Sequence, residues 1–180
     1  KLVEIKQLFK NTKVNFIAVS DFTNIAPEEN GKTFTENALI KARNASKISG
    51  LASIADDSGL CINALNGKPG VFSSRWAGKN NNFSEAINII EKKLENEENK
   101  AAYFICALAL VLNCNQEFTF IGKINGSLVF PPRGREGFGY DPIFLPDKQI
   151  LTFGQMYPDK KDLISHRFEA YKKMKEVFFV

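Results

Sequence analysis

The chain has 180 residues, of which 44% are hydrophobic and 24% are charged. This composition is typical of one compact globular domain and excludes wholesale disorder. The longest uncharged apolar stretch, residues 101–112, falls short of the ~20 residues that a membrane-spanning helix needs. We therefore expect no membrane anchor and, given the charged start of the chain, no signal peptide.

The net charge is +4, and the lysines are spread along the chain without a basic block. Such a balance suits an anionic small ligand as well as nucleic acid. The three cysteines, Cys61, Cys106 and Cys114, lie in or beside apolar segments and show no CxxC spacing. They are typical of reduced thiols in a cytoplasmic protein, so we expect no zinc site.

Apolar residues at helical spacing predict helices over residues 1–10, 34–49, 83–94 and the C-terminal stretch from Ile164. The helix over residues 34–49 is the best marked. Thr33-Phe34-Thr35-Glu36 forms a capping box at its start, and Gly50 follows its last periodic residue. We expect a polar stripe along it made of Asn37, Lys41 and Asn44.

Short apolar runs predict strands over residues 14–19, 51–55, 60–65, 103–112, 117–121 and 150–153. Residues 103–112 and 117–121 are expected to pair as a hairpin through residues 113–116, and residues 123–130 to continue the meander. Loops are expected over residues 21–32, 66–78 and 131–146. We find no internal repeat and no linker, which predicts a single α/β domain over residues 1–180.

Asp56-Asp57-Ser58-Gly59 follows the apolar run of residues 51–55, so we expect the strand to break into a turn at two adjacent carboxylates. Two neighbouring anions that are half-buried need a hard cation such as Mg²⁺, a shared proton or a cationic partner. The alternative is a solvated turn, because Asp, Ser and Gly are ordinary turn residues.

Glu36 and Lys41 flank the polar side of a helix start, which is also an anion site. A capping glutamate and a solvent-facing lysine are the alternative explanation.

In the loop around Phe138, three glycines leave the ring bare and suit stacking on a planar base. A flexible loop with a buried aromatic residue is the alternative. His166 is the chain's one histidine, and Arg167 beside it offers a planar donor fork. A histidine that caps a helix is the commoner case.

These groups supply carboxylates for a metal, cations for phosphates, an aromatic surface and a donor pair, which are the groups that bind a nucleoside triphosphate. Three common catalytic or nucleotide-binding motifs are missing from the sequence: a GxSxG nucleophile elbow, a Walker P-loop and a strand-linked GxGxxG.

With five ordered motifs the chain resembles the inosine triphosphate pyrophosphatase family, the housecleaning non-canonical purine nucleoside triphosphatases. The motifs are Thr33-Phe34-Thr35-Glu36-Asn37-Ala38 with Lys41-Ala42, Ala55-Asp56-Asp57-Ser58-Gly59-Leu60, Pro69-Gly70-Val71-Phe72-Ser73-Ser74-Arg75, Gly137-Phe138-Gly139-Tyr140-Asp141-Pro142-Ile143-Phe144 and Ser165-His166-Arg167. The resemblance implies an elongated mixed β-sheet with flanking helices and two lobes around a central cleft. It also implies a cytoplasmic homodimer that uses Mg²⁺ to hydrolyse XTP, ITP and dITP to the monophosphate and pyrophosphate.

The resemblance further implies roles for individual residues. Asp57 resembles the general base and metal-linked carboxylate, and Glu36 or, less closely, Glu29 would complete the metal site. Ser58 would touch the substrate. The remaining implied substrate-binding residues are Lys1, Lys41 and Lys161 for phosphates, Phe138, Gly139, Tyr140 and Asp141 for base and sugar, and His166 and Arg167 for the purine's six-position carbonyl.

The family begins with a strand and a Thr/Ser-x-Asn-x-x-Lys loop, of which this sequence holds the final lysine, Lys1. The resemblance therefore implies that this strand and a phosphate-contacting asparagine are missing ahead of Lys1.

Two other functions stay open. One is a Maf-type nucleotide pyrophosphatase, against which Ser165-His166-Arg167 argues. The other is a non-catalytic nucleotide- or RNA-binding module built on basic and aromatic residues. We expect a small-molecule nucleotide and no nucleic acid as partner.

Overall fold

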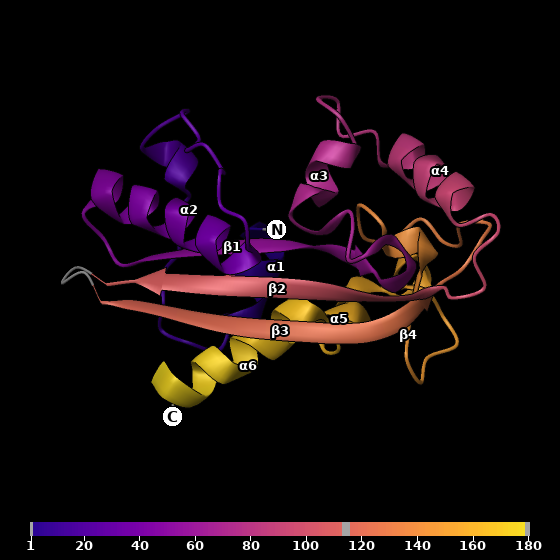
Figure 1. The fold of residues 1–180 in the computed structure, drawn as a ribbon. Helices are drawn as coiled ribbons and strands as arrows, with labels where there is room; N and C mark the ends of the chain where they lie inside the picture. The colour runs from indigo at the N-terminus through magenta and orange to yellow at the C-terminus, as the bar shows by residue number, and fades with distance from the viewer. Residues whose placement is uncertain (1, 113–115, 179–180) are drawn as a thin grey trace. The chain divides into compact units, whose positions relative to one another are not determined.

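The computed structural model describes residues 2–112 and 116–178. The fold is mixed α/β, as predicted, with a four-stranded antiparallel sheet in the order β1-β2-β3-β4 and flanking helices (Figure 1). The strands are β1 (Ser53–Ile62), β2 (Ala101–Val111), β3 (Glu117–Leu128) and β4 (Phe144–Pro146). The helices are α1 (Leu2–Leu8), α2 (Phe34–Ser49), α3 (Ser73–Trp76), α4 (Phe83–Lys93), α5 (Pro158–Asp162) and α6 (His166–Phe178).

The chain divides into two compact units. Unit 1 contains the segments up to Asp57, Cys106–Gly122 and from Arg167 onward, and unit 2 contains Ser58–Ile105 and Lys123–His166. The cleft that the resemblance implies, and the reading of residues 1–180 as one domain, stay predictions.

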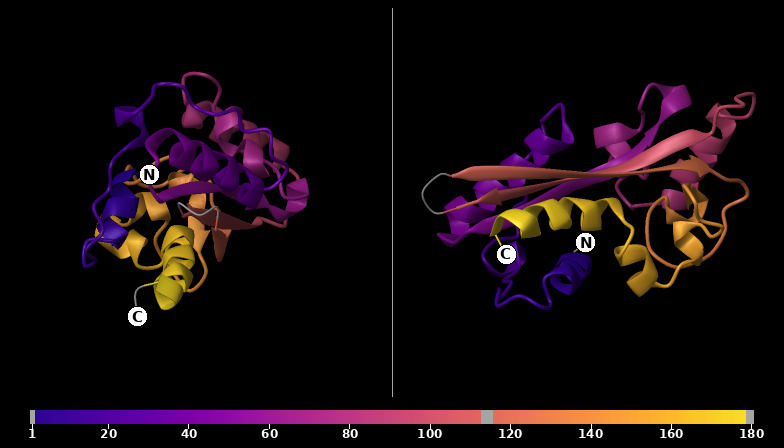
Figure 2. Two further views of the ribbon diagram at one scale, coloured as in Figure 1. Left: turned by 90° about the vertical axis from the view of Figure 1, so that its left-hand side faces the viewer. Right: turned by 90° about the horizontal axis from the view of Figure 1, so that it is seen from below.

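In unit 1, helices cover both faces of β2, because successive residues of a strand point to opposite sides. On one face, Ala38 and Ala42 of α2 pack against small side chains of β2, namely Ala107, Ala109 and Val111. On the other face, α1 and α6 pack together, as Figure 2 shows, against Cys106, Leu108 and Leu110. The alanines let α2 approach the sheet closely.

The predicted start and end of α2 are confirmed. Thr33 Oγ1 accepts from the Glu36 amide at 3.1 Å, Glu36 Oε2 accepts from the Thr33 amide at 3.2 Å, and Gly50 ends the helix with φ at 68°. A left-handed backbone is tolerated best by glycine. The capping box therefore fixes the first turn of the helix that carries Asn37 and Lys41.

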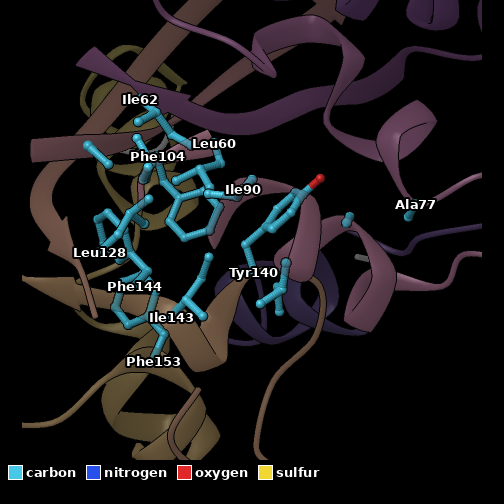
Figure 3. Close-up of a cluster of buried hydrophobic side chains, with 14 of the residues drawn as sticks. Leu60, Ile62, Ala77, Ile90, Phe104, Leu128, Tyr140, Ile143, Phe144 and Phe153 are labelled. Carbon is cyan, nitrogen blue, oxygen red and sulfur yellow. The ribbon is translucent and has the colours of Figure 1, made fainter. Parts of the chain in front are cut away.

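Unit 2 has a core of aromatic rings, shown in Figure 3. Phe104 of β2 meets Phe144 edge-on with ring centroids 4.6 Å apart and stacks on Phe153 at 6.0 Å. β4 pairs antiparallel with β3 and places Gly126 opposite Pro146. A Cβ at Gly126 would lie 2.3 Å from the Leu145 carbonyl oxygen, so this pairing requires glycine.

The predicted turn at Asp56-Asp57-Ser58-Gly59 is wrong. β1 runs without a break from Ser53 to Ile62, so it joins the two expected strands over residues 51–55 and 60–65, and Asn63–Leu65 form a 3-10 helix instead of its end. The local turn preference of these residues gives way because cations elsewhere in the chain pair with both carboxylates.

The strand predictions for residues 14–19 and 150–153 are also wrong. Residues 14–18 have no regular structure, and Val14, Ile17 and Val19 are exposed. Ile150 is exposed, Phe153 begins a 3-10 helix, and the strand of this region is β4 instead. An apolar run without a neighbouring strand cannot satisfy its backbone by sheet pairing.

β2 and β3 follow the hairpin expectation, and Leu112 donates its amide to the Gln116 carbonyl at 2.9 Å. Residues 113–115 of the expected connection lie outside the described residues. The stretch 123–130 adds no separate strand, because β3 itself continues to Leu128. Among the described helices, none is both long and apolar enough to cross a membrane.

Candidate active site

The two adjacent carboxylates of β1 are held by different cations of unit 1. Asp56 and Asp57 are 8% and 6% exposed. Because neighbouring strand residues point to opposite faces, their side chains diverge. Asp56 accepts from Arg167 Nη2 at 2.9 Å, and Asp57 accepts from Lys41 Nζ at 2.8 Å. Each buried charge thus has an opposite charge beside it, as burial requires.

Lys41 is the centre of a group of three charged side chains, here called the Lys41 cluster and made of Lys41, Asp57 and Glu29. Lys41 Nζ lies 2.8 Å from Asp57 Oδ1 and 3.1 Å from Glu29 Oε1. Burial on its own would lower the pKa of Lys41, but the hydrogen bonds and charges of Asp57 and Glu29 outweigh it and raise the pKa. The ammonium is therefore fully protonated at neutral pH.

Of the two glutamates considered for a metal site, Glu36 serves the helix cap. Its Oε2 accepts from the Lys32 amide at 2.5 Å and from the Thr33 amide at 3.2 Å. Glu29 instead points its carboxylate at the ammonium that also binds Asp57. The geometry thus brings Glu29, rather than Glu36, to Asp57.

The Lys41 cluster fits a hard divalent cation in its donor set. Asp57 and Glu29 both direct a carboxylate oxygen to a single positive charge, which the Lys41 ammonium supplies. Carboxylate oxygens are the ligands that Mg²⁺ prefers. Within residues 2–112 and 116–178, however, no group of three or more His, Cys, Asp or Glu side chains is arranged to hold a metal.

Arg167 is a deeply buried cation of unit 1, with 2% of its surface exposed. Its Nη1 donates to Glu4 Oε2 and its Nη2 donates to Asp56 Oδ2. Burial would lower the pKa of Arg167, but the charges of Asp56, Cys106 and Glu4 raise it. The predicted donor to a purine carbonyl is therefore engaged by two carboxylates.

In unit 2, the glycine-rich segment of residues 133–142, here called the Phe138 loop, presents an aromatic ring. Phe138 is 46% exposed, and Lys161 Nζ lies 4.8 Å from its ring centroid. Asp141 Oδ2 accepts from the Phe138 amide at 2.8 Å and from Lys161 Nζ at 2.7 Å. Gly137 has φ at 72°, and a Cβ there would lie 2.1 Å from Asp141 Oδ2. The loop can close on Asp141 because residue 137 is glycine.

The other predicted residues of unit 2 support this loop or the core. Tyr140 is buried, its hydroxyl donates to the Ser73 carbonyl at 2.8 Å, and burial raises its pKa (Figure 3). Gly139 adopts φ at 69°. His166 is buried and stacks on Phe104 with ring centroids 4.9 Å apart.

Ser58 is half-buried in β1. Lys1 lies outside the described residues.

Sequence reasoning missed two residues next to the predicted ones. In the sequence Glu4 is an ordinary polar position of an amphipathic helix pattern, and nothing there links it to Arg167, 163 residues away, with which it pairs in the structure. Asn37, which the helical pattern places in a polar stripe, is fully buried and accepts from the Gly31 amide at 2.8 Å. Its neighbours Ala38 and Ala42 could have indicated the buried side of α2.

Two groups of charged and aromatic side chains thus stand out, namely the carboxylates around Lys41 in unit 1 and the exposed ring of Phe138 beside Lys161 in unit 2. A family model described as the Ham1 family matches residues 1–177. The chain belongs to the Ham1 family, and the resemblance drawn from its motifs is confirmed.

Curated relatives are similar over most of their length. The chain is 47% identical to the dITP/XTP pyrophosphatase of Caulobacter vibrioides over 155 residues, which cover 85% of this chain and 80% of that protein. It is 43% identical to the dITP/XTP pyrophosphatase of Coxiella burnetii over 181 residues, covering 98% and 90%.

Solved structures of Ham1 proteins have the same fold as this chain. A HAM1 protein from Coxiella burnetii superposes with a TM-score of 0.90 at 41% identity over 98% of this chain and 91% of that one. The Staphylococcus aureus Ham1 protein gives 0.88 at 35% identity over 97% and 91%.

Proposed function

We propose that this protein hydrolyses the non-canonical purine nucleoside triphosphates XTP, ITP and dITP to the monophosphate and pyrophosphate, and so cleanses the nucleotide pool. The observation that carries the proposal is the Lys41 cluster, in which Asp57 and Glu29 share one ammonium, in a chain whose relatives are named dITP/XTP pyrophosphatases. We further propose that it acts in the cytoplasm as a homodimer.

In the proposed reaction, water adds to the α-phosphorus, the bond from that phosphorus to the bridging oxygen breaks, and pyrophosphate leaves. Asp57 accepts the proton of the water as general base. Lys41 holds phosphate oxygens by its ammonium, and Lys1 and Lys161 are proposed to bind phosphates in the same way. These cations reduce the repulsion between the polyanion and the attacking oxygen.

Asp57 and Glu29 would hold a divalent cation, which we propose to be Mg²⁺. When bound, such an ion neutralises phosphate oxygens and lowers the pKa of water. The Lys41 ammonium leaves the carboxylates with one net negative charge, since two carboxylates and one ammonium sum to minus one. A net negative charge favours a cation.

The Phe138 loop is proposed to bind the base. The exposed ring of Phe138 offers a face for stacking, which binds any purine. Asp141 fixes the loop, and Gly139, Tyr140 and Ser58 complete the proposed substrate contacts.

For selectivity among purines, we propose that His166 and Arg167 donate hydrogen bonds to the six-position carbonyl of the base. Arg167 donates one N–H from each Nη atom to a carboxylate, so in this role it would bind the carbonyl while also paired with Glu4 and Asp56.

The proposed product distinguishes this function from its alternatives. ITP incubated with Mg²⁺ and the protein should give IMP and pyrophosphate in phosphorus NMR. IDP and orthophosphate would contradict attack at the α-phosphorus, and binding without metal-dependent turnover would favour a non-catalytic nucleotide-binding module. Faster turnover of pyrimidine triphosphates would favour a Maf-type activity.

A further inference from the structure

The backbone that follows Glu29 is tied to the first turn of α2. The Gly31 amide donates to Asn37 Oδ1 at 2.8 Å, and the next two amides donate to the capping carboxylate of Glu36. Three consecutive amides are thus bound by two side chains of α2. The helix therefore determines the path of the chain two residues after the carboxylate of the Lys41 cluster.

The contact at Gly31 is too close for any side chain. A Cβ at this position would lie 2.6 Å from Asn37 Oδ1 and 2.7 Å from the Cβ of Glu36. Both neighbours belong to the first turn of α2, which the capping box holds in place. Glycine at position 31 is therefore part of the same tie.

Asn37 contributes to this tie through its carbonyl oxygen alone. Its side chain is fully buried, and Nδ2 has no hydrogen-bond partner among the residues that the structure describes. A buried donor without a partner costs ~1–3 kcal/mol. The nitrogen of the Asn37 amide thus lowers the stability of the fold, whereas its oxygen holds the Gly31 amide.

We infer that Asn37 is a positioning residue for the carboxylate of Glu29. Its oxygen holds the Gly31 amide, and this bond keeps the preceding loop where Glu29 reaches Lys41 and Asp57. The role rests on the proposed function, in which Glu29 and Asp57 hold a divalent cation. Asn37 itself touches neither the cation nor the substrate.

Replacing Asn37 by leucine tests this role, because leucine keeps the branched shape of the side chain and removes the acceptor. Mn²⁺ titrated alone into the Asn37→Leu protein should bind about 10-fold or more weakly, since loss of a group that orients a metal ligand typically costs ~10- to 100-fold. Hydrogen exchange of the Gly31 amide with solvent, measured by NMR, should be faster than in the wild-type protein. The free energy of unfolding should change little, because the unpaired donor is removed together with the acceptor.

Four further variants sharpen the test. Asn44→Leu removes an amide two turns along the same helix and should leave Mn²⁺ affinity at the wild-type value. Asn37→Asp keeps an acceptor for Gly31 and should restore most of the affinity. Glu29→Gln should weaken Mn²⁺ binding as Asn37→Leu does, and the double variant should lose no more than Glu29→Gln alone, because one residue acts through the other.

If Asn37 only stabilises the fold and does not position Glu29, the reverse pattern is expected. A lower free energy of unfolding with unchanged Mn²⁺ affinity in Asn37→Leu would overturn the inference, as would additive losses in the double variant. If the wild-type protein binds no Mn²⁺, the proposed function fails and the positioning role fails with it. Wild-type binding that Asn37→Leu leaves intact contradicts the positioning role alone.

Discussion

The Lys41 cluster of unit 1 and the Phe138 loop of unit 2 both join a carboxylate to a lysine, but the second partner differs. Lys41 binds Asp57 and a second carboxylate, Glu29, whereas Asp141 binds Lys161 and a backbone amide. The cluster therefore keeps a net negative charge, while the pair of the loop is neutral. The same kind of ion pair therefore leaves a net negative charge in one place and holds a loop with an exposed ring in the other.

The largest expected effect is on stability, at the neutral pair. Asp141 and Lys161 are each 3% exposed. Asp141→Asn leaves the Lys161 ammonium buried beside a neutral amide, which should lower the free energy of unfolding by about 3–5 kcal/mol in urea titrations. The double variant Asp141→Asn/Lys161→Met should regain much of this loss. A loss below about 1 kcal/mol, as for an exposed ion pair, would show that the pair does not hold the loop.

In the Lys41 cluster the expected effect falls on turnover. Lys41→Met leaves Asp57 and Glu29 without their shared cation, so ITP hydrolysis should fall by about 10² or more, the scale of a lost charge-stabilising group. The matched control is Lys47→Met on the exposed side of the same helix, which should keep wild-type kcat. Equal activity of the two variants would remove Lys41 from the reaction.

The exposed ring should matter for binding rather than for chemistry. Phe138→Ala removes the stacking surface, and stacking on an aromatic side chain contributes about 1–3 kcal/mol per base. We expect KM for ITP and for ATP to rise together, with kcat little changed. A change confined to one purine would show that Phe138 reads the base instead of only supporting it.

The smallest effect concerns Tyr140 and depends on pH. Tyr140→Phe loses the hydrogen bond to Ser73 and should cost about 1 kcal/mol of unfolding free energy at neutral pH. Burial raises the pKa of Tyr140 above its ordinary value of 10.0, so the folded state keeps the proton that the unfolded state releases. Above that pH the wild type should therefore lose stability faster than Tyr140→Phe. Parallel pH profiles would contradict this.

The sequence predicted the features that depend on residues close together along the chain, and it missed those that depend on residues far apart. The capping box, α2 and the glycines of the Phe138 loop follow from neighbouring residues, and they were predicted. β1 continues through Asp56, whose carboxylate is paired with Arg167, 111 residues away, and a prediction from local turn preference does not include such a contact.

For a similar reason, the sequence could not decide whether Glu29 or Glu36 is the second carboxylate beside Asp57. Glu36 fits both a capping box and a metal site in sequence, and only the fold shows that its carboxylate binds the Lys32 and Thr33 amides. The roles of Lys1, Ser58, His166 and Arg167 in substrate binding remain predictions from the family resemblance.

The most direct test of the division between chemistry and binding is the steady-state kinetics of ITP hydrolysis by Asp57→Asn and Phe138→Ala. Asp57→Asn keeps the size of the side chain and removes the proposed base, so kcat should fall by about 10² or more. Phe138→Ala should instead raise KM and leave kcat near the wild-type value. Near-normal kcat in a folded Asp57→Asn protein, or a loss of kcat without a rise in KM in Phe138→Ala, would contradict the account.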